Sequence, residues 1–110
     1  MRAGDIILIP FPFAELTNKK VRPSVVIAET KDKYHDVIVF AISSVVSAKI
    51  SANEIVIEPS SVNKLRSKSV IKVDRIVTVK REDMIAPLGK LTESELVVFK
   101  QKFKALIEEK

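Results

Sequence analysis

The chain has 110 residues, of which 46% are hydrophobic and 30% charged, and it contains no cysteine. These properties predict one folded domain, residues 1–110, and exclude a disulfide framework, a thiolate metal site and a disordered chain. The formal net charge of +5 favours an anionic partner, which is a nucleic acid, an acidic protein segment or a membrane surface.

The first half of the chain predicts three strands. Residues 6–9, 24–29 and 37–42 are short apolar runs bounded by turn-forming or polar residues, which is typical of buried strands. Pro10 ends the first run, and the polar segment 14–21 predicts a loop before the second.

The second half predicts short strands followed by one helix. Strands are expected at residues 54–58, 69–73 and 76–79, a loop or helical turn at 60–68, and one helical turn at 81–85 that residues 87–89 end. Thr92 and Glu95 have the spacing of a capping box, and Leu96, Phe99 and Phe103 then form one apolar stripe of a helix. Closely spaced strands without helices between them predict an antiparallel sheet or small barrel, mainly β with a C-terminal α-helix.

Targeting signals and cofactor motifs are not evident in the sequence. The apolar N-terminal stretch is short and interrupted by prolines, and no run is long enough for a membrane helix, so we expect a cytoplasmic protein without membrane association. The single histidine, His35, lies in a charged turn, and no His/Asp/Glu spacing indicates a metal site. With two glycines the chain has no glycine-rich phosphate loop, and we expect no cofactor.

The stretch VRPSVVI places an arginine at the start of a strand. Pro23 favours an extended conformation for Arg22 and suits the first position of the strand that follows. Ser43 closes the next strand, so an antiparallel pairing can bring Arg22 and Ser43 to the same end of the sheet. A guanidinium group matches two phosphate oxygens and a hydroxyl can donate to a third, a set that suits RNA because RNA supplies its own 2′-hydroxyl nucleophile. An arginine that only forms an ion pair or contacts phosphate is the alternative on these grounds.

Five segments in order resemble the MazF/PemK family of toxin endoribonucleases, from residue 4 to residue 107. They are GDIILIPFPF, KKVRPSVVI, VIVFAISS, SVIKVDRIVTV and LTESELVVFKQKFKALI. The resemblance implies a small SH3-like antiparallel barrel that works as a homodimer and as the toxin of a type II toxin–antitoxin pair. It implies sequence-selective, metal-independent cleavage of single-stranded RNA to a 2′,3′-cyclic phosphate, and a cognate acidic antitoxin as partner.

The resemblance also implies roles for individual residues. Arg22 matches the catalytic arginine of the family, and Ser43 stands where the family usually has threonine, with Ser44 as the neighbouring candidate. The first loop is short and lacks the glycine of many members, and Glu15 is its only acid, so no acidic helper is assigned. The residues expected to bind RNA are Lys19, Lys20, Ser44, Lys49, Arg66, Lys68 and Phe13, with Phe11 as an alternative stacking aromatic.

Two other functions remain open from the sequence. A CcdB-like toxin of the same fold would bind gyrase without cutting RNA, although such a protein has no need of a phosphate-directed arginine. A non-catalytic relative would bind nucleic acid with a steep salt dependence and leave it intact.

Overall fold

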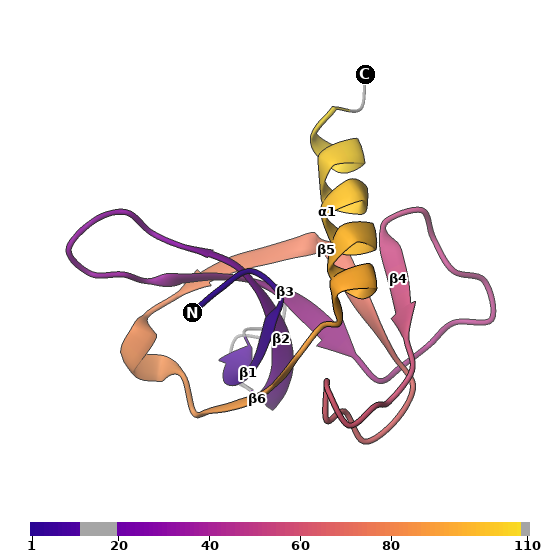
Figure 1. The fold of residues 1–110 in the computed structure, drawn as a ribbon, viewed down its shortest axis with the longest axis horizontal. Helices are drawn as coiled ribbons and strands as arrows, with labels where there is room; N and C mark the ends of the chain where they lie inside the picture. Colours follow the sequence, from indigo (N-terminus) through magenta and orange to yellow (C-terminus); the bar gives the residue numbers. More distant parts are fainter. Residues whose placement is uncertain (12–19, 109–110) are drawn as a thin grey trace.

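The computed structural model describes residues 1–11 and 20–108, and within them six strands form one antiparallel sheet in the order β4-β5-β3-β2-β1-β6. The sheet curls into a half-barrel, and the C-terminal helix packs against β4 and β5 (Figure 1). The elements are β1 (Asp5–Phe11), β2 (Lys20–Glu29), β3 (Val37–Ser43), β4 (Glu54–Ile57), β5 (Ser69–Val79), the 3₁₀ helix η1 (Arg81–Asp83), β6 (Ala86–Lys90) and α1 (Glu93–Ile107). This confirms the predicted fold class.

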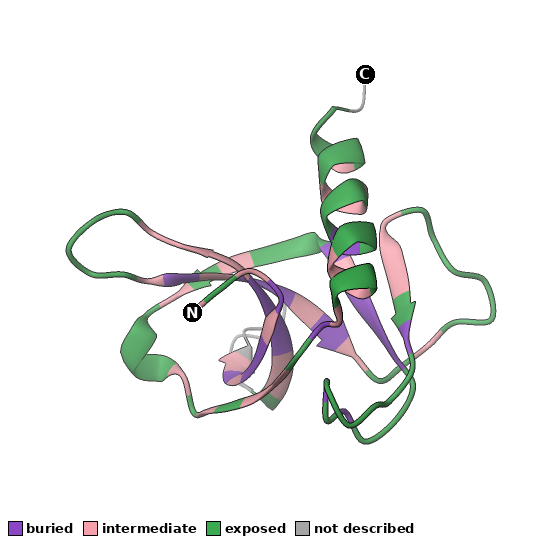
Figure 2. Ribbon diagram, in the orientation of Figure 1, coloured by how far each residue is buried: buried purple, intermediate pink, exposed green. Residues whose placement is uncertain are grey.

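Hydrophobic side chains are buried on both faces of the central strands. The larger core lies between the sheet and α1 and includes Val25, Phe40 and Phe99. A second core on the opposite face includes Val26 and Val39. Because successive side chains of a strand point to opposite faces, neighbours such as Val25 and Val26 serve different cores. Figure 2 shows this burial concentrated in the middle strands, whereas the outer side of α1 is exposed.

Helix α1 begins at the predicted capping box. The Glu95 backbone N–H donates to Thr92 Oγ1 at 3.2 Å, and the Thr92 N–H donates to Glu95 Oε1 at 2.8 Å. The apolar stripe of α1 then meets Phe40 of β3, with ring centroids 5.0 Å from Phe99 and 5.1 Å from Phe103. Both ring pairs are edge-to-face, the arrangement that the aromatic quadrupole favours.

Strand β5 is one long strand where the sequence predicted two. Its pairing with β3 passes from Ile76 opposite Phe40 to Lys72 opposite Ala41, so residues 73–75 form an irregularity at the predicted break. The strand changes direction there (Figure 1). Bulged residues bend a strand without ending it, which explains why the sequence predicted two strands on either side of Asp74 and Arg75.

Residues 87–89, which the sequence predicted only as the end of a helical turn, belong to strand β6. Within the described chain, β6 pairs only with β1 and lies at the edge of the sheet. Proline is tolerated on an edge strand because its missing N–H interrupts no ladder on the open side. No described helix is both long and apolar enough to span a membrane.

Candidate functional site

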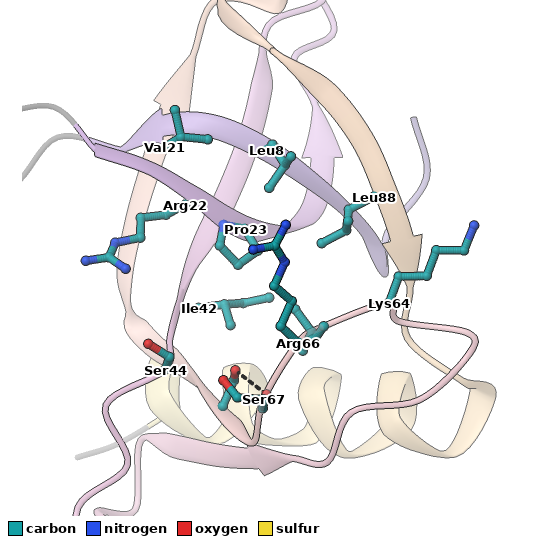
Figure 3. Close-up of a pocket in the computed structure, with 12 residues that line it drawn as sticks. Leu8, Val21, Arg22, Pro23, Ile42, Ser44, Lys64, Arg66, Ser67 and Leu88 are labelled. Atoms are coloured by element: carbon teal, nitrogen blue, oxygen red, sulfur yellow. Dashed lines mark hydrogen bonds between the residues drawn. The ribbon is translucent and has the colours of Figure 1, made fainter.

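A cleft of about 480 Å³ lies where β2 begins and β3 ends, beside the segment 60–68. Leu8, Pro23, Ile42 and Leu88 supply much of its apolar wall. Its polar lining comes from three parts of the chain and consists of Arg22, Ser44, Lys64, Arg66, Ser67 and Ser69. Figure 3 shows Arg66 reaching toward Pro23, whereas Arg22 extends away from Pro23 on the side of the cleft where Ser44 lies.

Strand pairing fixes the position of Arg22. Arg22 lies opposite Ile9 of β1, and Pro23 lies opposite Leu8. Strand β2 therefore begins earlier than predicted, and Pro23 lies inside it. The ladder from β1 and the steric bulk of the Pro23 ring both restrict the backbone at Arg22, which is half-buried.

Ser43 is the last residue of β3, and Ser44 follows it in a bend. The register pairs Ser24 with Ala41, and the same register continued along both strands sets Arg22 opposite Ser43. Directly opposite residues share a face, so the pairing favours Ser43 as the neighbour of Arg22. Ser44 follows the end of β3 and lines the cleft together with Ile42, whereas Ser43 is not among the residues that line it. The Val45 N–H donates to Ser43 Oγ at 3.1 Å, which leaves the hydroxyl hydrogen of Ser43 able to donate elsewhere.

A buried asparagine shapes the segment that carries Lys64 and Arg66. Asn63 is fully buried. Its Oδ1 accepts from the backbone N–H of Ser60 and of Leu65, each at 2.9 Å, and its Nδ2 donates to the Glu58 carbonyl at 2.8 Å. These three bonds fold the segment back on itself, and Lys64 and Arg66 of this segment both line the cleft.

Close packing against β6 holds the same segment from the other side. A Cβ atom added at Gly89 would lie 2.5 Å from the Val62 carbonyl oxygen and 2.6 Å from that of Asn63. The Lys90 N–H donates to the Val62 carbonyl at 3.1 Å. Glycine is therefore required at residue 89 for the backbones to come this close.

The charge in the cleft is one-sided. Among the residues that the structure describes, the lining contains three cations, Arg22, Lys64 and Arg66, and no carboxylate. The described carboxyl groups with lowered pKa values, Glu29, Asp32 and Glu54, are not part of it. A cleft with this charge attracts phosphate groups.

The other predicted RNA-binding residues fall in different places. Lys20 is exposed at the start of β2, and Lys49 is exposed between β3 and β4. Lys68 is exposed and lies 3.9 Å from Glu58, outside the cleft lining. Lys19, Phe13 and Glu15 lie outside the described residues, and so does the side chain of Phe11.

Sequence reasoning missed Lys64, Ser67 and Ser69 as members of the cleft. Nothing in the local sequence marks them, since lysines and serines of this kind are common on protein surfaces. Asn63 indicates a tight turn, because asparagine side chains bond to the nearby backbone, but it does not mark these three residues as members of a cleft. Residues 1–11 and 20–108 contain no group of three or more His, Asp or Glu side chains placed to hold a metal ion.

Comparison with known proteins identifies a family that matches the chain. Residues 2–107 match the model of a family described as PemK-like, MazF-like toxins of type II toxin–antitoxin systems. No curated protein matches the sequence.

Solved structures share the fold at low sequence identity. An endoribonuclease in complex with its cognate antitoxin, from a mycobacterial species, has a TM-score of 0.75 and 12% identity over 100% of this chain and 97% of its own. The Mycobacterium tuberculosis toxin MazF-mt6 has a TM-score of 0.65 and 19% identity over 93% and 96% of the two chains. A further mycobacterial endoribonuclease has a TM-score of 0.69 and 10% identity over 97% and 90%. The family match over nearly the whole chain shows that this protein belongs to the PemK-like, MazF-like toxins of type II toxin–antitoxin systems.

Proposed function

We propose that this toxin is a sequence-selective endoribonuclease that cleaves single-stranded RNA without a metal ion. The observation that carries the proposal is the cleft beside Arg22, whose lining contains three cations and several hydroxyl groups and no described carboxylate. The family supports a toxic activity, and two of the similar structures are endoribonucleases.

The reaction is a transfer of the phosphoryl group within the RNA. The 2′-oxygen attacks the adjacent phosphorus, a new P–O bond forms, and the bond to the 5′-oxygen of the next nucleotide breaks. The products are a 2′,3′-cyclic phosphate and a 5′-hydroxyl end. The 2′-hydroxyl loses a proton and the leaving oxygen gains one, and we assign both transfers to water, since arginine and serine are poor acids and bases near neutral pH.

Arg22 and Ser43 stabilise the charge that develops on the phosphate. The guanidinium of Arg22 remains charged throughout and can donate to two phosphate oxygens. The free hydroxyl hydrogen of Ser43 donates to a third, and its shared face with Arg22 supports this role. Ser44, on the cleft side of β3, contacts the RNA strand beside the cut.

The partners follow from charge and exposed apolar surface. A net charge of +5 suits an acidic cognate antitoxin as well as RNA. We assign a homodimer on the basis of the family, and exposed apolar side chains such as those of Ile76, Val97 and Ile107 are available for such a contact. The proposed site of action is the cytoplasm, where messenger RNA is available.

Cleavage of a long single-stranded RNA in EDTA tests the mechanism. We expect discrete cuts with cyclic phosphate ends from the wild type, and a loss of at least about 100-fold in rate for Arg22→Ala, because charge stabilisation of this kind contributes roughly that much. Arg75→Ala is the matched control, since Arg75 is exposed on β5 outside the cleft lining, and its rate should equal that of the wild type.

Three results would contradict the proposal. Arg22→Ala that cuts at the wild-type rate would remove the assigned role of that residue. Intact RNA that is nevertheless bound would identify a non-catalytic relative, and intact RNA together with gyrase inhibition would identify a CcdB-like toxin. Ser43→Ala and Ser44→Ala, measured in the same assay, separate the two hydroxyls, since Ser43→Ala should lower kcat and Ser44→Ala should mainly raise KM.

A further inference from the structure

A second cleft, lined by Pro87 to Lys90 of β6, shares two residues with the first. Its volume is about 650 Å³, and both clefts are lined by Lys64 and Leu88. The two hollows are therefore neighbours, and Lys64 stands at the point where they meet. Figure 3 shows the Lys64 side chain extending away from the first cleft, near Leu88.

Lys64 has a backbone conformation that is unusual for a lysine. Its φ is 57°, in the left-handed region, where a Cβ atom is sterically unfavourable. The Lys64 N–H donates to the Ser60 carbonyl at 2.9 Å, and the hydrogen bonds of Asn63 fix the residues on either side. Glycine would satisfy the same turn without steric cost, so the presence of a lysine there points to a use for its side chain.

The second cleft has features that suit a nucleotide. Val62, Met84 and Pro87 offer apolar surface for a base, and Lys90 adds a second cation to Lys64. The carboxylate of Asp5 also lines this cleft, and it accepts from the Arg2 backbone N–H at 2.9 Å. Single-stranded nucleic acid binds where cations track the phosphates and apolar side chains contact the bases, which is the arrangement found here.

We propose that Lys64 binds the phosphate between the nucleotide in the first cleft and its neighbour, and that the second cleft holds this neighbouring part of the same RNA strand. The inference rests on the proposed RNA cleavage and adds to it a binding site beyond the cut. In this proposal the RNA strand crosses β6 over Leu88, from the first cleft into the second.

Shortened substrates combined with Lys64 variants test this path. The cuts made by the wild type in a long RNA are mapped first, and an oligoribonucleotide that spans one cut is then shortened one nucleotide at a time from each end. On the full oligonucleotide we expect Lys64→Gly and Lys64→Asn to lower kcat/KM about fivefold in 0.1 M salt, the effect of losing one phosphate contact. The loss should appear in KM and should vanish once the nucleotides of the second cleft have been removed from one end.

His35→Gly is the matched control. His35 is the other described non-glycine residue with a positive φ, 52°. It lies in the turn between β2 and β3, at the other end of these strands from Arg22 and Ser43. His35→Gly should leave kcat/KM unchanged. Lys64→Gly should keep Tm at or above the wild-type value because glycine removes the steric conflict, so a loss of activity cannot be assigned to misfolding.

The outcomes separate this inference from the proposed function. If Lys64→Gly cuts the full oligonucleotide like the wild type, or loses the same factor on every shortened one, the proposed RNA path is overturned and the proposed RNA cleavage is unaffected.

If the wild type binds a fluorescent single-stranded RNA without cutting it, the proposed RNA cleavage is overturned, and Lys64 is tested by the salt dependence of binding. Lys64→Gly should then reduce the slope of log K against log salt by about 0.7, and an unchanged slope overturns the inference. A wild type that binds no RNA also overturns the inference. So does a Lys64→Gly variant whose binding is weakened only for poly-L-glutamate, an acidic polypeptide, and not for RNA.

Discussion

Two buried serines show how a single hydroxyl group affects stability. Ser69 Oγ donates to the Ser67 carbonyl at 2.9 Å, whereas Ser24 Oγ is buried without a hydrogen-bond partner among the described residues. We expect Ser24→Ala to raise the free energy of unfolding by about 1 kcal/mol, because it removes an unsatisfied polar group. Ser69→Ala should lower the free energy of unfolding by about 1 kcal/mol, because this substitution removes a hydroxyl group that is hydrogen-bonded. Urea denaturation of both variants checks the pair, and a loss of stability in Ser24→Ala would contradict the first expectation.

The contact between β6 and the segment 60–68 is the arrangement of elements on which both clefts depend. A methyl group at Gly89 would overlap the carbonyl groups of Val62 and Asn63, and backbone cannot move aside as a flexible side chain can. We expect Gly89→Ala to cost about 2 kcal/mol of stability, as overpacking usually does. It should also raise KM for RNA, since the displaced segment carries Lys64 and Arg66. Urea denaturation and cleavage kinetics measure the two effects, and a fully stable, fully active variant would show that the segment shifts without cost.

The response of the whole molecule to acid follows from its paired carboxyl groups. The Ser51 backbone N–H is the largest cause that lowers the pKa of Glu54, and Lys72, 3.6 Å away across the β4–β5 pair, lowers it further. The hydrogen bond from the Met1 amino group lowers the pKa of Glu29 most. Both groups bind protons more readily in the unfolded chain, where the ordinary pKa is 4.5, so the stability that they add is present above this value and is lost as the pH falls below it.

Chemical denaturation between pH 7 and pH 3 tests this expectation. The free energy of unfolding should fall through the lower half of the range, and Glu54→Gln should make the fall less steep because one of the titrating groups is gone. The variant should also be less stable than the wild type at pH 7. Identical pH profiles for the two proteins would show that Glu54 contributes nothing to the acid response.

The elements that could be predicted from the sequence are those that depend on residues close together in the chain. The Thr92–Glu95 capping box placed the start of α1 correctly, and the apolar runs located the strands of the central sheet. Edge strand β6 was missed because its proline and glycine look like turn residues, and only its pairing with β1 and its packing on segment 60–68 explain them.

The candidate site was predictable only in part. Arg22 could be singled out because Pro23 acts on its neighbour in the sequence, a local effect. The choice between Ser43 and Ser44 depends on the register of β3, where one residue exchanges the two faces. Lys64 could not be found, because its place between two clefts depends on Asn63 and β6, and its positive φ is unexpected for a residue with a Cβ atom.

The pairing of β1 with β6 also constrains how the protein is made. These strands lie far apart in the sequence, so the ribosome must synthesise residues 86–90 before β1 can pair fully with its second neighbour. Contacts between such distant segments form late because a long loop must close first. Both clefts need Leu88 of β6, and neither exists on a shorter nascent chain. Until that strand emerges, the messenger RNA under translation meets no assembled cleft on the chain that it encodes.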